Sequence, residues 1–174
     1  MRTGAFFTIL FLVLAGCKNP ETKNAHPLYF DLAGYFKAEA KRLGDKHQEV
    51  KKSVDQNGQV QARKVKNLDW EVEFELFSQS DINKPSWRGY YNVTNSGAFL
   101  IYTAKNPDLR TRRILIKKEQ NRVRYILISN AVKNALYNSV ERLTYYPDSL
   151  YRIEKKQQVR IIGRNSYRIE GHIQ

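Results

Sequence analysis

The pattern of apolar and polar positions divides the chain into three parts. Residues 5–13 form an apolar run that only Thr8 interrupts, and residues 18–27 are polar and contain two prolines. From residue 28 onward, apolar positions recur first at helical spacing and later in alternation, which indicates a helix followed by strands. We therefore expect one globular domain over residues 28–174, joined to the N-terminal segment by a flexible tether over residues 17–27.

The domain is predicted to begin with an amphipathic helix over residues 27–43. Pro27 suits the first turn of such a helix, and Gly44 suits its end. A continuous apolar face of this kind usually packs on a sheet. That face consists of Leu28, Leu32, Tyr35, Phe36, Ala40 and Leu43.

A hairpin is predicted next, because residues 49–54 and 59–65 flank the pair Asn57-Gly58. Asn-Gly is the strongest short-range signal for a two-residue turn between antiparallel strands. Both arms are rich in polar residues, so we expect this hairpin at the periphery of the fold.

Residues 68–78 fit either a strand or a helix. Alternation favours a strand, but Trp70, Phe74 and Phe77 fall on one helical face, and Asp69 is a typical residue for starting a helix. We favour a short second helix. The acids at positions 71, 73 and 75 have no histidine or second acidic group nearby in the sequence, so we expect a solvated face there and not a metal site.

The rest of the chain is predicted to be β-structure with short connections, which favours an antiparallel meander. The fold class expected is therefore α+β, with one or two helices packed on a curved antiparallel β-sheet. The runs Ile114-Leu115-Ile116 and Tyr125-Ile126-Leu127-Ile128 are apolar at every position, as in interior strands. The strand candidates are residues 87–94, 98–104, 112–118, 122–129, 136–145, 150–155, 159–163 and 166–173.

One four-residue sequence occurs twice in this region. Tyr151-Arg152-Ile153-Glu154 returns as Tyr167-Arg168-Ile169-Glu170. We interpret the recurrence as two similar strands, since a repeat fold needs longer units repeated several times.

The first 17 residues have the pattern of an exported precursor. Arg2 provides a basic start, and the apolar run is too short for a stable membrane span. The run ends at Leu14-Ala15-Gly16-Cys17, which resembles the lipobox of bacterial lipoprotein precursors. The resemblance implies a signal peptide over residues 1–16, cleavage between Gly16 and Cys17, and a diacylglyceryl group on the sulfur of Cys17.

The same resemblance implies an exported protein anchored to a membrane by lipid. Several acyl chains, each stabilised by about 0.8 kcal/mol per buried methylene, make release negligible. In enterobacterial lipoproteins an aspartate directly after the cysteine favours retention in the inner membrane. Lys18 occupies that position here, which resembles a lipoprotein of the outer membrane, so we expect that location. The segments 80–85 and 145–151 also resemble uncharacterised lipoproteins of Bacteroidota, which have no activity to transfer. Cys17 is the only cysteine, so an internal disulfide and a cysteine-based metal site are both impossible. The lipobox resemblance implies covalent lipid on Cys17, and we expect no other cofactor.

The charge is strongly basic, with 30 Lys and Arg against 17 Asp and Glu and a formal net charge of +13. Such an excess attracts anionic surfaces and does not select a fold. For an exported protein we favour anionic lipid or lipopolysaccharide over nucleic acid, with solubility alone as the alternative. A basic cluster is predicted to concentrate at the ends of one hairpin and to contact such a surface. It comprises Arg110, Arg112, Arg113, Lys117, Lys118, Arg122 and Arg124.

No motif of a known chemistry stands out. The three histidines, His26, His47 and His172, lack the spacing of metal ligands, and no nucleophile elbow or phosphate-binding glycine loop occurs. We therefore expect a non-catalytic envelope protein with a structural, assembly or binding role. The alternative is a carrier or receptor for an apolar or lipid ligand, in which the helix caps a cavity of a half-barrel sheet. A packed core would favour the first class, and an open apolar cavity would favour the second.

Overall fold

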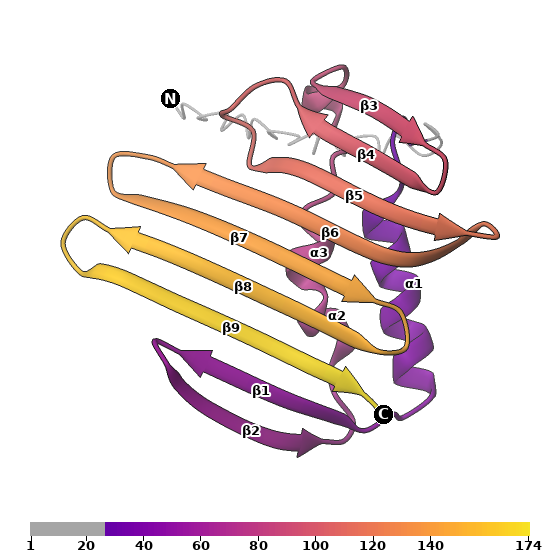
Figure 1. The fold of residues 1–174 in the computed structure, drawn as a ribbon, viewed down its shortest axis with the longest axis vertical. Helices are drawn as coiled ribbons and strands as arrows, with labels where there is room; N and C mark the ends of the chain where they lie inside the picture. Colours follow the sequence, from indigo (N-terminus) through magenta and orange to yellow (C-terminus); the bar gives the residue numbers. More distant parts are fainter. Residues whose placement is uncertain (1–26) are drawn as a thin grey trace, which may run out of the picture.

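The computed structural model describes residues 27–174, which form one open sheet of nine antiparallel strands with short helices against one face (Figure 1). The predicted signal peptide, Gly16, Cys17, His26 and nearly all of the predicted tether lie outside the described residues. The expected α+β fold with a curved antiparallel meander is confirmed.

The elements follow in chain order. They are α1 (Leu32–Asp45), β1 (Val50–Gln56), β2 (Gln59–Val65), α2 (Trp70–Glu73), α3 (Glu75–Ser78), the 3-10 helix η1 (Pro85–Trp87), β3 (Tyr91–Ser96), β4 (Phe99–Ala104), β5 (Thr111–Glu119), β6 (Arg122–Lys133), β7 (Tyr137–Tyr146), β8 (Leu150–Val159) and β9 (Gly163–Ile173).

The sheet order is β2-β1-β9-β8-β7-β6-β5-β4-β3. Strands β3 to β9 pair with their sequence neighbours, and the β1–β2 hairpin adds beside the C-terminal strand β9. The hairpin therefore forms one edge of the sheet, as its polar arms predicted. Strands β5 and β6 both have partners on either side, which confirms that the two fully apolar runs belong to interior strands.

Helix α1 starts five residues later than predicted. Asp31 is its N-cap, and its carboxylate accepts a hydrogen bond from the Gly34 amide at 2.8 Å. Tyr29 and Phe30 stay outside the helix because their amides donate to the Asn83 side chain and the Tyr102 hydroxyl, each at 2.9 Å. The expectation that Pro27 opens the helix and that Leu28 joins its apolar face is wrong, and Leu28 is exposed.

The end of the helix also differs from the prediction. The helix passes through Gly44 to Asp45, and Lys46 is its C-cap. The residue with positive φ after the helix is His47, at 50°, whose amide donates to the Gly44 carbonyl at 3.1 Å.

Residues 68–78 are helical, which confirms the favoured interpretation, and they form the two short helices α2 and α3. The Asp69 carboxylate caps α2 by accepting hydrogen bonds from the amides of residues 71 and 72. Trp70, Phe74 and Phe77 are buried together on one face, as their spacing predicted. One side of α1 and this aromatic face therefore approach each other over the sheet.

The acids of this segment do not share one environment. Glu71 and Glu75 are exposed, but the Glu73 side chain is only 10% exposed and forms an ion pair with Lys52. The Tyr151 hydroxyl also donates to Glu73, at 2.6 Å. The expectation of a solvated face is therefore wrong for Glu73, because the helix turns this residue toward the sheet.

The space between the helices and the sheet is filled by aromatic rings. The Phe36 ring centroid lies 4.7 Å from that of Phe77 and 5.2 Å from those of Phe74 and Tyr145. All four residues are at most 1% exposed. Each such ring contributes about 1.5–3 kcal/mol by burial, and edge-to-face pairs add about 0.5–1.5 kcal/mol. The apolar face of α1 thus completes a core, as the packed-core interpretation requires.

Two strand predictions fail near irregular segments. Residues 87–94 were expected to be a strand, but 85–87 form η1 and β3 begins only at Tyr91. Pro85 suits the first position of η1, and Gly89 follows with φ at 82°, so the backbone is not extended before residue 91. The separate strands expected at 150–155 and 159–163 are one strand, β8, followed by a turn at 160–162.

The recurring four-residue sequence forms two neighbouring strands, as we interpreted it. In the β8–β9 register Ile153 stands opposite Ile169. The antiparallel arrangement then sets Arg152 against Glu170 and Glu154 against Arg168, with N···O distances of 2.5 and 3.4 Å. The two copies thus complement each other in charge across the strand pair.

Gly171 of β9 allows the fully buried Tyr151 ring to lie directly over the backbone of its partner strand. A Cβ at position 171 would come within 2.1 Å of the Tyr151 ring, a distance no real contact shows. The glycine is therefore required by the close approach of the ring.

Candidate binding surfaces

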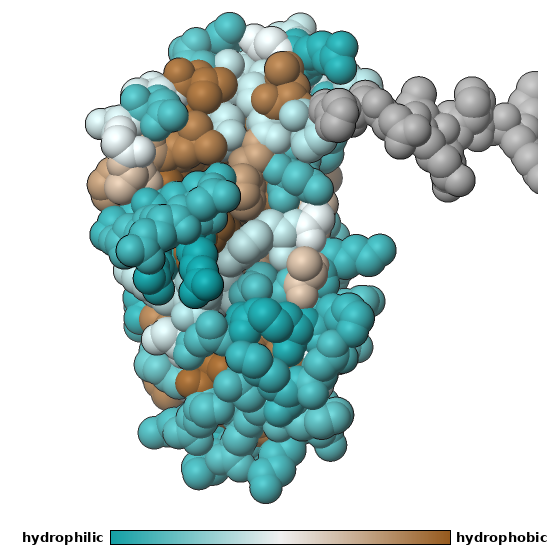
Figure 2. All heavy atoms as spheres, turned by 90° about the vertical axis from the view of Figure 1, so that its right-hand side faces the viewer, coloured by the Kyte–Doolittle hydropathy of each residue, from teal (hydrophilic) through white to brown (hydrophobic). Residues whose placement is uncertain are grey.

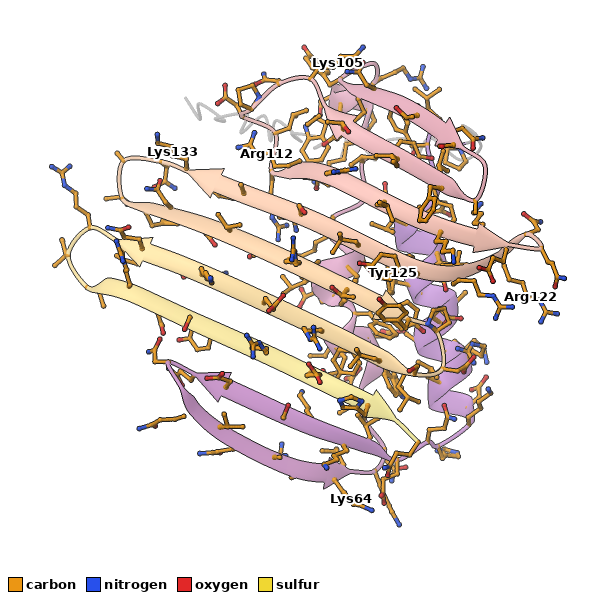
Figure 3. The ribbon with its side chains drawn as sticks, viewed as in Figure 1. Lys64, Lys105, Arg112, Arg122, Tyr125 and Lys133 are labelled. Carbon is orange, nitrogen blue, oxygen red and sulfur yellow. The ribbon has the colours of Figure 1, made fainter. Side chains whose placement is uncertain are left out.

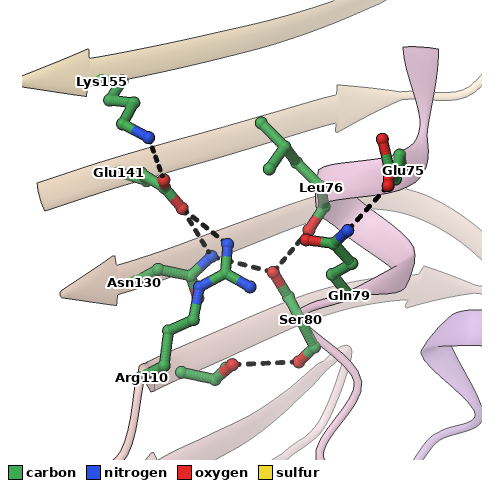
Figure 4. A network of polar contacts seen from close by, with 9 residues as sticks. Glu75, Leu76, Gln79, Ser80, Arg110, Asn130, Glu141 and Lys155 are labelled. Atoms are coloured by element: carbon green, nitrogen blue, oxygen red, sulfur yellow. Dashed lines mark hydrogen bonds and ion pairs between the residues drawn. The ribbon is translucent and has the colours of Figure 1, made fainter. Parts of the chain in front are cut away.

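A buried polar network joins α3 to the middle of the sheet (Figure 4). Asn130 donates to the Ser80 hydroxyl at 2.9 Å, and Ser80 donates to the Leu76 carbonyl at 2.7 Å. On its other side, Asn130 donates to Glu141 at 3.3 Å. Arg110 completes the network through a 3.0 Å ion pair with the same Glu141 carboxylate.

Glu141 is held in its ionised form. Burial by itself raises the pKa of this carboxyl, but hydrogen bonds from Arg110 and Lys155 outweigh burial and lower the pKa below its ordinary value. The Lys155 ammonium lies 3.1 Å from the second carboxylate oxygen. An ionised acid whose oxygens are already bonded is a poor proton donor or base, so we assign this network to the positioning of α3.

A second carboxylate, Glu39 of α1, is bound in a similar way. The Tyr145 hydroxyl donates to it, and Arg42 contacts it at 2.8 Å. Arg42 also contacts Asp148 in the β7–β8 turn at 2.6 Å, which ties the helix to that turn. Burial, and next the hydrogen bond to Glu39, raise the pKa of Tyr145 far above its ordinary value, so this hydroxyl stays neutral.

A surface groove of about 660 Å³ lies between α1, the β5–β6 turn and the β7–β8 turn. Phe30 and Tyr35 form apolar parts of its wall, and Lys118, Arg122 and Arg124 line the turn side. Figure 2 faces this end of the molecule and shows strongly hydrophilic side chains gathered beside more apolar ones. The groove is open and charged, unlike an enclosed apolar cavity.

The predicted basic cluster is divided between the two ends of the β5–β6 hairpin, as expected. Arg122 and Arg112 lie at opposite ends in Figure 3. The basic turn, as we call Lys117, Lys118, Arg122 and Arg124, surrounds the connection between the strands. Arg110, Arg112 and Arg113 lie at the other end of β5.

These two groups differ in their partners. Arg110 is bound to Glu141, and Arg112 donates to the Asn106 carbonyl at 3.4 Å. In the basic turn, Glu119 lies 2.8 Å from Lys117 and 3.4 Å from Arg124. The basic turn therefore has one acidic side chain against four basic ones, so its net charge is positive.

The basic turn adjoins the start of the folded domain. The Lys118 ammonium lies 5.0 Å from the centroid of the Phe30 ring and forms a cation–π contact with it. Phe30 is only three residues after the first described residue. The predicted tether therefore joins the domain beside the most basic turn.

The end of the sheet opposite the basic turn carries exposed aliphatic side chains that the sequence analysis missed. Ile161 and Ile162 in the β8–β9 turn are 93% and 85% exposed, and Leu136 in the β6–β7 turn is 71% exposed. The Arg160 amide donates to the Leu136 carbonyl at 3.0 Å, which joins the two turns. We call residues 134–136 and 160–162 the far tip. Its sequence signal is the run Arg160 to Arg164, in which two isoleucines precede a glycine.

Within residues 27–174, histidine and acidic side chains form no group of three or more that could hold a metal ion. His47 is exposed, and exposed His172 lies 2.7 Å from Glu170. Over the same residues, every helix is too short or too polar to cross a membrane. Comparison with known proteins gives no match among family models, curated proteins or solved structures.

Proposed function

We propose that this protein is a lipid-anchored, non-catalytic lipoprotein of the cell envelope, on the outer membrane, whose domain rests its basic turn on the anionic surface beside its anchor. Lipid on Cys17 holds the protein, and the short tether keeps the domain near the headgroups. Ten extended residues span at most about 35 Å.

The observation that carries the proposal is the contact between Lys118 and Phe30. It puts the start of the domain and the basic turn side by side, so a lipid upstream of residue 27 brings this turn toward the membrane first. Each Lys or Arg close to an anionic membrane contributes about 1 kcal/mol. The aromatic packing behind α1 supports a binding or structural role over that of a carrier, which needs an apolar cavity under the helix.

The test uses the lipidated full chain in vesicles that contain phosphatidylglycerol. Once Cys17 is acylated, a cysteine introduced at exposed Gln120 is the only free thiol and can carry a fluorescent donor. Energy transfer to a headgroup-labelled lipid should be strong, and should fall at high salt, since salt screens exposed charges.

Charge reversal decides whether the basic turn is responsible. Arg122→Glu with Arg124→Glu should lower the transfer several-fold, whereas the matched pair Arg112→Glu with Arg113→Glu, at the other end of β5, should leave it unchanged. Equal transfer in neutral and anionic vesicles would contradict the contact. Mass spectrometry of the mature N-terminus checks the anchor itself, and an unmodified peptide starting elsewhere than Cys17 would refute it.

A further inference from the structure

We propose that the far tip is a second membrane-binding surface, which inserts its aliphatic side chains at the boundary between headgroups and acyl chains of an anionic bilayer. Ile161, Ile162 and Leu136 supply the apolar part. All three are more than 70% exposed, whereas most other exposed aliphatic residues are scattered singly.

The charges around the far tip have one sign. Arg160 and Arg164 flank the isoleucines, Lys133 ends β6, and Lys156 lies three residues before the end of β8, all of them exposed. Among the described residues none of these four forms an ion pair within 4.0 Å. No acid occurs in residues 131–138 or 155–165. An aliphatic centre with a basic rim is the pattern that favours the interface of an anionic membrane.

The far tip is fixed in shape before it meets a partner. The Asn134 side chain accepts hydrogen bonds from the amides of Leu136 and Tyr137, each at 2.9 Å. The Arg160 amide then donates to the Leu136 carbonyl, so both turns project together. Because these groups are already ordered, binding needs little further ordering of the backbone.

The size and shape of the tip favour a bilayer over a protein. Stable protein interfaces bury about 800 Å² on each partner, and three aliphatic side chains on two hairpin turns supply far less. Exposed turns of this size can instead enter a fluid surface that closes around them. A second copy of this chain is also unfavourable, since its tip would carry the same four positive charges.

The tip and the basic turn face opposite ways. Arg122 and Lys133 mark the two ends of β6 (Figure 3), and eleven steps of about 3.4 Å separate the ends by at most about 37 Å. A domain that rests its basic turn on its own membrane therefore directs the far tip toward another lipid surface. Insertion of the tip depends on different residues from the proposed function and can fail alone, whereas the direction of the tip toward a second membrane rests on the proposed function.

The experiment again uses the lipidated full chain, anchored in vesicles that contain phosphatidylglycerol. A cysteine introduced at exposed Ala135, beside Leu136, carries an environment-sensitive fluorophore. A second population of vesicles with the same headgroups and brominated acyl chains is then added. We expect the Ala135 label to shift to shorter wavelength and to be quenched, the vesicles to cluster, and a label at Gln120 to stay unquenched.

The variants separate the apolar and the charged contributions. Ile161→Ser with Ile162→Ser should reduce clustering by about tenfold or more, since burial of aliphatic side chains drives insertion. The matched pair Val72→Ser with Val93→Ser, at exposed aliphatic positions away from the tip, should leave clustering unchanged. Arg160→Gln with Arg164→Gln should weaken clustering and reduce its dependence on salt.

Each outcome decides between alternatives. Unchanged clustering in the isoleucine variant, or an Ala135 label that is quenched by bromine in neither the added nor the anchoring vesicles, would overturn the far tip as an insertion site and leave the basic turn untouched. In a second arm the brominated acyl chains are placed in the anchoring vesicles instead, and quenching of the Ala135 label there would support insertion but would overturn the orientation in the proposed function. Dimers that sediment as such and vanish in the isoleucine variant would assign the tip to a second copy and overturn the lipid proposal.

Discussion

The helix-covered part of the sheet and the far tip use the same kinds of residue in opposite ways. Under the helices, Phe36 and Phe74 are at most 1% exposed, whereas Ile161 and Ile162 at the tip stand almost entirely in solvent. Strand β8 shows the change along its inner face, where buried Tyr151 and Ile153 give way to Lys155, Gln157 and Val159, which are only half-buried. Polar side chains on the inner face of β8 therefore mark the point beyond which the helices no longer cover the sheet. The isoleucines lie beyond that point and are not part of the core. The difference teaches that the aliphatic side chains at the far tip do not contribute to the packed core, whereas the rings under the helices form it.

The largest expected difference between the two regions is in the free energy of unfolding. Phe36→Ala should lose about 3–5 kcal/mol, because the surrounding rings cannot close the space it leaves. Ile161→Ala should change stability by less than about 0.5 kcal/mol, since its side chain is already in water. Denaturant titration measures both values. A similar loss for both variants would mean that the tip belongs to the cooperative core and would remove the contrast.

A smaller loss of stability is expected from a substitution in β9, where the Tyr151 ring packs on the backbone. Gly171→Ala should cost about 1–3 kcal/mol, because the Tyr151 ring must move to admit a Cβ. Ser166→Ala, an exposed substitution on the same strand and nearer the tip, should be close to neutral. Thermal unfolding followed by near-ultraviolet circular dichroism reports on the tyrosine as well as the melting temperature. An unperturbed melting temperature for Gly171→Ala would contradict the close packing described above.

The smallest of the three effects depends on pH. Because Arg110 and Lys155 lower the pKa of Glu141 in the folded state, the unfolded chain binds more protons in acid. The stabilisation is therefore complete above the ordinary value of 4.5 and is lost as the pH falls toward the lower folded pKa. Glu141→Gln should lose about 1–2 kcal/mol at pH 7 and show a flatter stability profile between pH 5 and pH 3. Exposed Glu71→Gln should keep the profile of the parent, and a flat parent profile would argue against the ion pairs.

Local signals predicted the parts of the fold that local chemistry determines. Asn57-Gly58 sets its hairpin because both residues adopt positive φ, and β1 and β2 pair in full register around them. The start of α1 was mispredicted because Tyr29 and Phe30 are held by Asn83 and Tyr102, which lie 54 and 72 residues further along the chain. Contacts at such separations leave no mark in the pattern of a single segment.

The candidate surfaces were likewise predictable only where local sequence determines them. Pairing of β5 with β6 follows from their apolar runs, and it correctly separated the basic residues into two ends. Arg110 forms its ion pair with Glu141, which belongs to β7. The sequence of β5 alone therefore could not show that the positive charge at the Arg110 end is partly neutralised. The far tip was missed because two adjacent isoleucines favour a strand, whereas the β8–β9 register places them in the turn that closes the hairpin.

The recurring four residues have a further consequence for how this chain avoids self-association. A strand with the sequence Tyr-Arg-Ile-Glu is complementary to an antiparallel copy of itself, since each arginine then meets a glutamate. A slip of two residues between β8 and β9 would instead oppose Arg152 to Arg168, or Glu154 to Glu170, and like charges directly opposite destabilise a strand pair. The same complementarity would allow β8 of one molecule to pair with β8 of another if the strand were exposed. Both copies lie in the interior of the sheet, where their neighbours occupy every pairing position, and the edges are left to β2 and β3.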